Sequence, residues 1–198
     1  EIGLDFAASL RSILRQDPDV LLIGEIRDEE TAAIAVKFAM TGHLVFSTVH
    51  ANDAPSTIMR LLDLGIPPFL LGSSLNLIMA QRLVRTIDKE NKEEYTPTSD
   101  ELDLLNISEK DGASNKFYRG LKKQSNRNTG YKGRTAIHEI IEVNSEIRKL
   151  IFDGASQNKI LDSAIDNGMT TLRKAGIEKV FEGKTTIEEV VRSTVRDD

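Results

Sequence analysis

The chain has 198 residues and no cysteine, and 39% of its residues are hydrophobic and 29% charged. This composition is typical of an ordinary globular protein, and it excludes disulfides and cysteine-ligated zinc. The formal net charge of −5 and the lack of a long basic run give no reason to expect nucleic acid as a partner. No apolar run approaches the roughly 20 residues that span a bilayer, and the first residues lack the regions of a signal peptide, so we expect a cytoplasmic protein.

The first 85 residues alternate between helical and strand-like patterns. In chain order, the spacing of apolar residues predicts a helix over 4–16, a strand over 20–24, a helix over 27–42, a strand over 43–50, and helices over 53–65 and 69–85. Strands that alternate with helices predict an α/β protein with a parallel sheet. A sheet of this kind needs more strands than the two found here.

The composition changes after Arg85. Residues 86–128 hold nine acids and eight bases among few large apolar residues, which predicts a small, exposed and partly mobile insert. From Tyr131 the pattern is regular again, and residues 134–143 predict a strand. Helical patterns follow at 144–152, 156–167, 170–182 and 186–195.

An acid stands at the end of the first predicted strand, in "DPDVLLIGEIRDEE" (17–30). Glu25 would lie at the carboxyl edge of a sheet, where α/β proteins bind ligands. Nucleotide hydrolases use such an acid to orient water, often beside a second acid that helps to hold Mg²⁺. Here the preceding residue is Gly24. A buried strand followed by the acidic first turn of a helix explains the same residues without a function.

Two histidines bracket the second predicted strand. His43 and His50 are seven residues apart, so on a regular strand they would lie roughly 23 Å apart and on opposite faces. They cannot then share a metal ion. If the strands are parallel, His50 lies at the same edge as Glu25. A lone histidine is more often a structural hydrogen-bonding residue than a catalyst, and we interpret His138 as a structural residue.

The segment "FEGKTT" (181–186) contains the Gly-Lys-Thr that ends a phosphate-binding loop. The full pattern requires glycine at position 178, where the residue is Glu178, and it requires a preceding strand. We therefore interpret Gly183 as a helix stop and Thr186 as the cap of the next helix. No serine stands in a glycine-flanked turn, so acyl-transfer chemistry is not indicated.

Five blocks in register together resemble the secretion ATPase family, the motors of type II secretion and type IV pilus assembly, whose relatives drive DNA uptake and conjugation. The blocks are "LRSILRQDPDVLLIGEIRDEETA", "TGHLVFSTVHANDAPSTIMRLLDLG", "AQRLVR", "TGYKGRTAIHEII" and "TTIEEVVRST". Their order and spacing match over nearly the whole chain, except for 86–128.

This resemblance implies an α/β fold in three parts. Residues 1–85 would form the C-terminal half of a RecA-like P-loop NTPase core. Residues 86–128 would be an insert equivalent to the family's zinc-binding subdomain, and residues 129–198 a mainly helical C-terminal subdomain. It further implies a homo-hexamer, cytoplasmic and peripheral to the inner membrane through a membrane platform and other machinery proteins.

The resemblance also assigns roles to single residues. "LLIGEIRD" matches the family's Walker B block, which itself carries glycine in place of the usual aspartate. Glu25 matches the acid that acts on the attacking water and, through water, on Mg²⁺. His43 and His50 match a histidine box that reports the state of the γ-phosphate of ATP, and Arg82 is a weaker candidate for the nucleotide side.

Two departures from the family pattern matter. In this family the Walker A loop, the acidic Asp box and the interdomain arginines precede the blocks found here, so we expect them upstream of Glu1; the chain also has no initiator methionine. Without the Walker A loop, the chain alone should bind ATP poorly or not at all. Many assembly motors also hold zinc with two Cys-x-x-Cys pairs. The residues at those four places are Asp88, Asn91, Lys123 and Asn126. Lysine and asparagine do not suit zinc, so we expect no zinc and an insert held by packing alone.

The sequence therefore predicts part of a hexameric ATPase motor for pilus assembly or type II secretion, with ATP and Mg²⁺ as cofactors. A retraction motor fits less well, because those typically lack the 86–128 insert. Two alternatives stay open, namely a competence or conjugation motor and a non-hydrolysing module that docks the ring to its partners.

Overall fold

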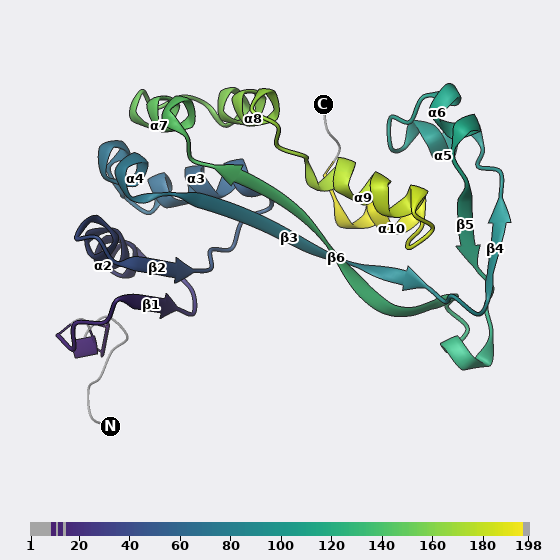
Figure 1. Cartoon of the computed structure of the whole chain (residues 1–198), viewed down its shortest axis with the longest axis horizontal. Coiled ribbons are helices and arrows are strands. Elements are labelled where there is room, and N and C mark those ends of the chain that lie inside the picture. The colour runs from purple at the N-terminus through teal and green to yellow at the C-terminus, as the bar shows by residue number, and fades with distance from the viewer. Residues whose placement is uncertain (1–8, 11, 14, 196–198) are drawn as a thin grey trace. The chain divides into compact units, whose positions relative to one another are not determined.

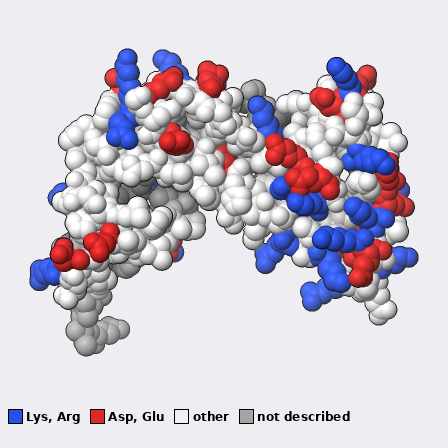
Figure 2. Space-filling view, viewed as in Figure 1, with Lys and Arg blue, Asp and Glu red and all other residues white. Residues whose placement is uncertain are grey.

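The computed structural model describes residues 9–10, 12–13 and 15–195 (Figure 1). The chain divides into two compact units: unit 1 lies within Glu1–Met79 and Ile140–Met169, and unit 2 within Ala80–Glu139 and Thr170–Asp198. The division at residues 85 and 128 follows sequence blocks rather than contacts, and it stays a prediction. Acidic and basic side chains occur on the visible surface of both units (Figure 2). Among the described residues, no helix has the length and apolarity to cross a membrane.

Unit 1 contains the predicted parallel pair of strands. Strand β1 (Val20–Ile23) pairs with β2 (Leu44–Ser47) in parallel, and helix α2 (Glu29–Met40) connects them. The helix predicted over 4–16 lies largely outside the described residues; of those described, 9, 10, 12 and 13 are helical. The expectation of a buried first strand holds for one face only, because Leu21 and Ile23 are buried and Leu22 is 75% exposed. Covering both faces of a parallel sheet requires more layers than this unit contains.

Side-chain caps begin the next two helices where the sequence predicts them. Asp28 accepts a hydrogen bond from the backbone N–H of Thr31 and caps α2. Asp53 caps α3 (Ala54–Asp63) through a reciprocal pair of bonds with Ser56. These carboxylates satisfy amides that the first turn leaves unpaired, so they fix the points at which the chain leaves the sheet edge.

The helix predicted over 69–85 is wrong beyond its first turns. Helix α4 (Pro68–Ser74) ends early, and the chain continues as the long strand β3 (Leu77–Ile87). Strand β3 pairs with β6 (Tyr131–Glu142), which contains the strand predicted over 134–143. A pairing between segments so far apart in sequence overrides local helical spacing, because strand preference depends on the packing context.

The four C-terminal helices are present near the predicted positions: α7 (Ser145–Phe152) and α8 (Gln157–Asp166) in unit 1, and α9 (Leu172–Phe181) and α10 (Ile187–Ser193) in unit 2. Gly183 follows the end of α9 with φ +65°, and Thr186 caps α10 by accepting from the N–H of Glu189. The interpretation of "FEGKTT" as a helix stop and a cap, rather than a phosphate loop, is therefore confirmed.

The insert has regular structure and contributes to a core, although most of its residues are exposed, as the sequence predicts. Its elements are β4 (Lys92–Tyr95), α5 (Ser99–Asp103), α6 (Glu109–Ser114), β5 (Phe117–Gly120) and the 3₁₀ turn η1 (Gln124–Asn126), with β4 and β5 antiparallel. Leu102, Leu105 and Phe117 pack in one buried cluster with Val180 and Val190 of α9 and α10. This apolar contact joins the insert to the C-terminal helices of unit 2.

A polar cluster occupies the four places at which zinc ligands stand in many assembly motors. Asp88 Oδ2 accepts hydrogen bonds from Nδ2 of Asn91 (2.9 Å) and of Asn126 (3.0 Å). The backbone N–H of Lys123 donates to Asn126 Oδ1 at 3.0 Å. Asp88 and Asn126 are buried. The expectation that the insert is held by packing alone is therefore wrong, because this cluster, hereafter the Asp88 cluster, ties both ends of the insert together.

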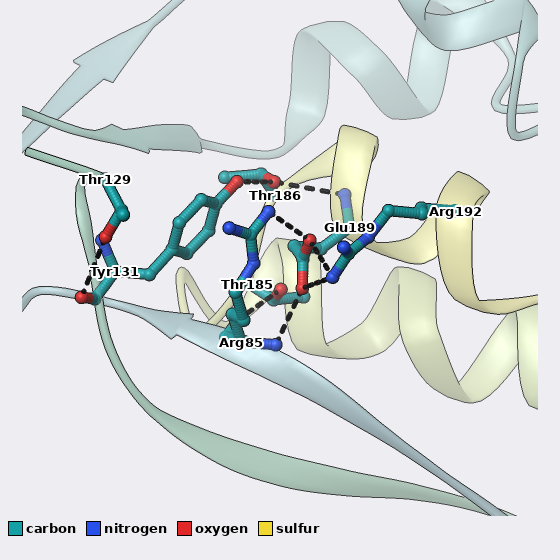
Figure 3. A network of polar contacts seen from close by, with 7 residues as sticks. All are labelled: Arg85, Thr129, Tyr131, Thr185, Thr186, Glu189 and Arg192. Atoms are coloured by element: carbon teal, nitrogen blue, oxygen red, sulfur yellow. Dashed lines mark hydrogen bonds and ion pairs between the residues drawn. The ribbon is translucent and has the colours of Figure 1, made fainter.

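A buried ion pair joins β3 to α10 in unit 2 (Figure 3). Glu189, with no exposed surface, accepts from the backbone N–H of Arg85 at 2.8 Å and from its guanidinium at 2.6 Å. Arg192 also lies 2.8 Å from Glu189. The Arg85 guanidinium stacks 4.0 Å from the centre of the Tyr131 ring, whose hydroxyl meets Thr186. Arg85, from the block "AQRLVR", thus connects β3 with α10 and β6 in unit 2.

Candidate functional site

Glu25 and His50 lie together at one edge of the β1–β2 sheet. Glu25 follows β1 by two residues, and His50 follows β2 by three. Because the two strands are parallel, their carboxyl ends meet at the same edge. His50 Nε2 lies 3.1 Å from Glu25 Oε2. The expectation that these two residues share an edge is therefore confirmed.

Backbone contacts beyond the strands position the acid. The Thr48 hydroxyl donates to the carbonyl of Gly24 at 2.6 Å, and the N–H of Ile26 donates to the carbonyl of Thr48 at 2.9 Å. The segment that carries Glu25 is thus tied on both sides of this residue to the segment that leads to His50. A Cβ atom on Gly24 would meet nothing within 4 Å, so crowding among the described residues does not require glycine there.

Arg27 is a third member of the site, and sequence reasoning did not find it. Its guanidinium lies 2.6 Å from Glu25 Oε1, so each carboxylate oxygen of Glu25 has one nitrogen partner. Arg27 holds the pKa of Glu25 below its ordinary value, and His50 acts in the same direction. The available signal was spacing, because residues two apart on an extended segment point the same way. Both partners are largely solvent-exposed, so these contacts orient Glu25 more than they stabilise the fold.

The structure does not bring His43 to this edge. His43 precedes β2 and lies at its opposite end from His50. Its ring stacks on Phe38 with centroids 4.0 Å apart, and its Nδ1 lies 2.9 Å from the Thr41 hydroxyl. These contacts fit a structural residue at the end of α2. Arg82 lies on β3 in unit 2, and its nucleotide-side role stays a prediction.

Glu25 could contact a metal ion through a bound water molecule, but the described residues near it do not form a complete set of metal ligands. Among the described residues, no three acidic or histidine side chains gather as a metal site. A single carboxylate at a sheet edge suits Mg²⁺, which keeps several of its waters and takes few protein ligands. The neighbouring His50 can meet an anionic group in the same space, because its side chain is 86% exposed.

Comparisons with known proteins agree with this geometry. The sequence model of the family described as "Type II/IV secretion system protein" matches residues 1–192. The type IV pilus assembly ATPase PilB of Myxococcus xanthus is 47% identical over all of this chain and 35% of its own length. The type II secretion system protein E of Xanthomonas campestris is 45% identical over 98% of this chain and 34% of its own. The chain therefore spans about a third of the length of these relatives.

Solved structures of motor ATPases have the same fold. The pilus retraction motor PilT with bound ADP matches with a TM-score of 0.66 and 28% identity, covering 96% of this chain and 43% of its own. The Legionella pneumophila ATPase DotB matches with a TM-score of 0.64 over 94% of this chain and 41% of its own; at 19% identity it speaks for the fold alone. The family model matches 192 residues, the five sequence blocks keep their order, and Glu25 lies at the edge of a parallel pair of strands. The chain therefore belongs to the type II/IV secretion system protein family.

Proposed function

We propose that the protein to which this chain belongs is an ATPase motor that drives type IV pilus assembly or type II secretion. The relatives that bear these names support the proposal. The single observation that carries it is the contact of Glu25 with His50 at the carboxyl edge of parallel strands. That edge is where α/β proteins place the groups that act on bound ligands.

In this proposal Glu25 orients the attacking water and reaches Mg²⁺ through a water molecule. Arg27 lowers the pKa of Glu25, so the carboxylate is ionised at neutral pH and accepts hydrogen bonds from water. His50, on the other carboxylate oxygen, is placed to respond to a phosphate group near Glu25. Bound Mg²⁺ and ATP supply the metal charge and the phosphoryl group. His43 and Arg82 stay candidate nucleotide-sensing residues.

The assembly state and the location are parts of the same proposal. We place the protein in a homo-hexamer in the cytoplasm, attached to the inner membrane through platform and machinery proteins. It uses ATP and Mg²⁺ and no zinc. The three-part division at residues 85 and 128 belongs here as well. This chain alone should bind ATP poorly, because its sequence contains no complete phosphate-binding loop.

Substitution of the proposed catalytic acid tests this function. In the full-length protein, Glu25→Gln should leave ATP binding intact and lower turnover by about 100-fold or more, the scale of losing a catalytic acid or base. The control is Glu178→Gln, which makes the same chemical change at an exposed position of α9 in unit 2. Equal turnover in Glu25→Gln and the wild type would remove Glu25 from the mechanism.

A docking module that does not hydrolyse ATP is the second candidate. The lack of a complete phosphate loop in these 198 residues favours it for this chain taken alone. ATP turnover of the full-length protein distinguishes the two candidates. A protein that binds its partners but shows no turnover would support the docking module and refute the motor.

A further inference from the structure

Seven basic residues in unit 2 line two neighbouring hollows, and one of them, Arg85, is paired with Glu189. The larger hollow has a volume of about 770 Å³ and the smaller about 560 Å³, and Lys132 and Arg134 line both. Lys89, Lys92 and Lys184 also line the larger hollow, and Arg127 the smaller. We call the six residues other than Arg85 the basic face. Figure 2 shows Lys and Arg side chains gathered over unit 2, with acidic side chains among them.

The acids that line the hollows do little to neutralise the basic face. Asp88 is buried and accepts hydrogen bonds from asparagine amides. Glu182 is held by Lys179 and Lys184. Glu90 is the third acid in these linings. The hollows are thus lined by three acids and by the six bases of the basic face. Positive charge is concentrated here although the formal net charge of the whole chain is −5.

Three cations of the basic face form no ion pair within the described part of the chain, although Lys132 interacts electrostatically with the buried Asp88. No ion pair there engages Lys89, Lys132 or Arg134. Elsewhere in the same unit, exposed bases do find acids, as in the pairs Arg119–Glu93 and Lys116–Glu94 across β4 and β5. Unpaired like charges that converge on a hollow repel one another, and an anionic partner relieves that repulsion.

The floor of the hollows is held in place by the fold. The Thr86 hydroxyl donates to the carbonyl of Lys132, and Gly133 beside it takes φ +88°. The Lys92 ammonium sits 4.2 Å from the centre of the Tyr118 ring, which restricts it. The Asp88 cluster borders both hollows, since Asp88 lines one and Asn126 the other. A cation that is already restricted, such as Lys92, loses less conformational entropy on binding than a free lysine does.

We propose that the basic face binds an acidic segment of a protein partner. The cations line concave hollows, so side-chain carboxylates on an extended segment can enter, whereas the flat surface of a bilayer meets only the rim. Nucleic acid fits less well, because the chain as a whole is acidic. The proposal does not depend on ATP hydrolysis at Glu25, because the basic face belongs to unit 2 and Glu25 to unit 1.

Charge reversal in the full-length protein tests this surface. The probe is a fluorescein-labelled oligoglutamate peptide, followed by fluorescence polarisation over a salt series. The wild type should bind it more weakly as salt rises, and Lys89→Glu/Lys132→Glu should weaken binding by about tenfold or more, because charges at an interface steer and hold an oppositely charged partner. The control is Lys110→Glu/Lys174→Glu, with the same charge change at exposed lysines of unit 2 outside both hollows; it should change binding by less than about twofold.

Three results would overturn the proposal. The wild type could fail to bind the peptide even at low salt, or both double variants could lose binding equally. In parallel, vesicles of phosphatidylglycerol and phosphatidylcholine are sedimented with each protein. Loss of vesicle binding, without loss of peptide binding, in Lys89→Glu/Lys132→Glu would identify a lipid surface instead. An unchanged melting temperature shows that a variant is folded, and the single change Lys132→Gln provides a milder test if the double variant is not.

Discussion

The Nε2 atom of His50 lies 3.1 Å from Oε2 of Glu25, although 25 positions separate these residues in the sequence. The parallel pairing of β1 with β2 brings them together, and the contacts between Thr48, Gly24 and Ile26 hold the two chain segments in register. The other carboxylate oxygen of Glu25 faces Arg27. Glu25 is therefore oriented from both sides by nitrogen groups, and each of the two can be tested alone.

His50 should matter more for turnover than His43. In the full-length protein, His50→Ala should lower ATP turnover by about tenfold or more, because it removes a group that contacts the proposed catalytic acid. His43→Ala should change turnover less, since His43 stacks on Phe38 at the other end of β2. Steady-state ATPase assays of both variants check this. Equal losses would contradict the distinction that the structure makes.

Removal of Arg27 should shift the acidic limb of the pH–turnover profile upward. Arg27 lowers the pKa of Glu25, so in Arg27→Ala this pKa rises toward its ordinary value and the carboxylate protonates at a higher pH. Activity should therefore be lost earlier on acidification. Arg27→Lys keeps a positive charge and should largely restore the profile. Identical profiles for the wild type and Arg27→Ala would show that Arg27 does not act on Glu25.

The Asp88 cluster should stabilise the insert. Asp88→Ala leaves the amides of Asn91 and Asn126 without this acceptor, which costs about 1–3 kcal/mol for buried polar groups. Hydrogen–deuterium exchange of residues 86–128 in the full-length protein should speed up accordingly. Asp103→Ala, at an exposed position of α5, is the control and should exchange like the wild type. Unchanged exchange in Asp88→Ala would show that the Asp88 cluster does not stabilise the insert.

Acid should weaken the same cluster. Hydrogen bonds from Asn91 and Asn126 lower the pKa of Asp88 in the folded protein. A carboxyl group with a lowered folded pKa contributes stability above its unfolded pKa of about 3.9, and that contribution is lost as the pH falls through the folded value. Protection of 86–128 against exchange, taken relative to the intrinsic exchange rate at each pH, should thus fall below about pH 4 in the wild type. Asp88→Ala should lack this part of the acid response.

Zinc analysis tests whether the Asp88 cluster takes the place of the zinc site that many assembly motors carry. Purified full-length protein should contain no stoichiometric zinc, because its side chains at 88, 91, 123 and 126 hydrogen-bond to one another or suit zinc poorly. Replacement of all four residues by cysteine should create a site for one zinc ion. The four positions form two pairs, 88/91 and 123/126, each with two residues between its members as in a Cys-x-x-Cys motif, and the cluster already brings the two pairs together. A variant with cysteines at 88 and 91 only is the control. Stoichiometric zinc in the wild type, or none in the four-cysteine variant, would contradict this interpretation.

Loss of the Glu189 charge should destabilise unit 2. Burial raises the pKa of Glu189, but hydrogen bonds and charge from Arg85 outweigh burial, and the pKa lies below its ordinary value. Glu189→Gln leaves the Arg85 charge uncompensated, and breaking a buried pair costs about 3–5 kcal/mol. We expect less than this, because the Arg85 side chain is 34% exposed. Urea unfolding measures the change; Glu188→Gln, the adjacent exposed acid, should leave the unfolding free energy nearly unchanged.

The sequence by itself predicted the features that depend on local chemistry. The helices predicted over 27–42 and 53–65 begin where the carboxylates of Asp28 and Asp53 cap unpaired amides, and Gly183 and Thr186 mark a helix stop and start for equally local reasons. The family was also readable, because five blocks keep their order and spacing. The position of Glu25 at a strand end follows from an apolar run that breaks into charges.

Tertiary structure alone decided the features that depend on partners distant in the chain. Strand β3 was predicted as a helix, because its pairing with β6 outweighs local apolar spacing. Arg27 joined the site through side-chain geometry, and His43 was kept from it by the length of β2. The insert packs against α9 and α10 in one buried apolar cluster. At the positions where relatives carry zinc ligands, Asp88 accepts hydrogen bonds from asparagine side chains. Local preferences are worth fractions of a kcal/mol per residue, so long-range burial and pairing decide wherever the two disagree.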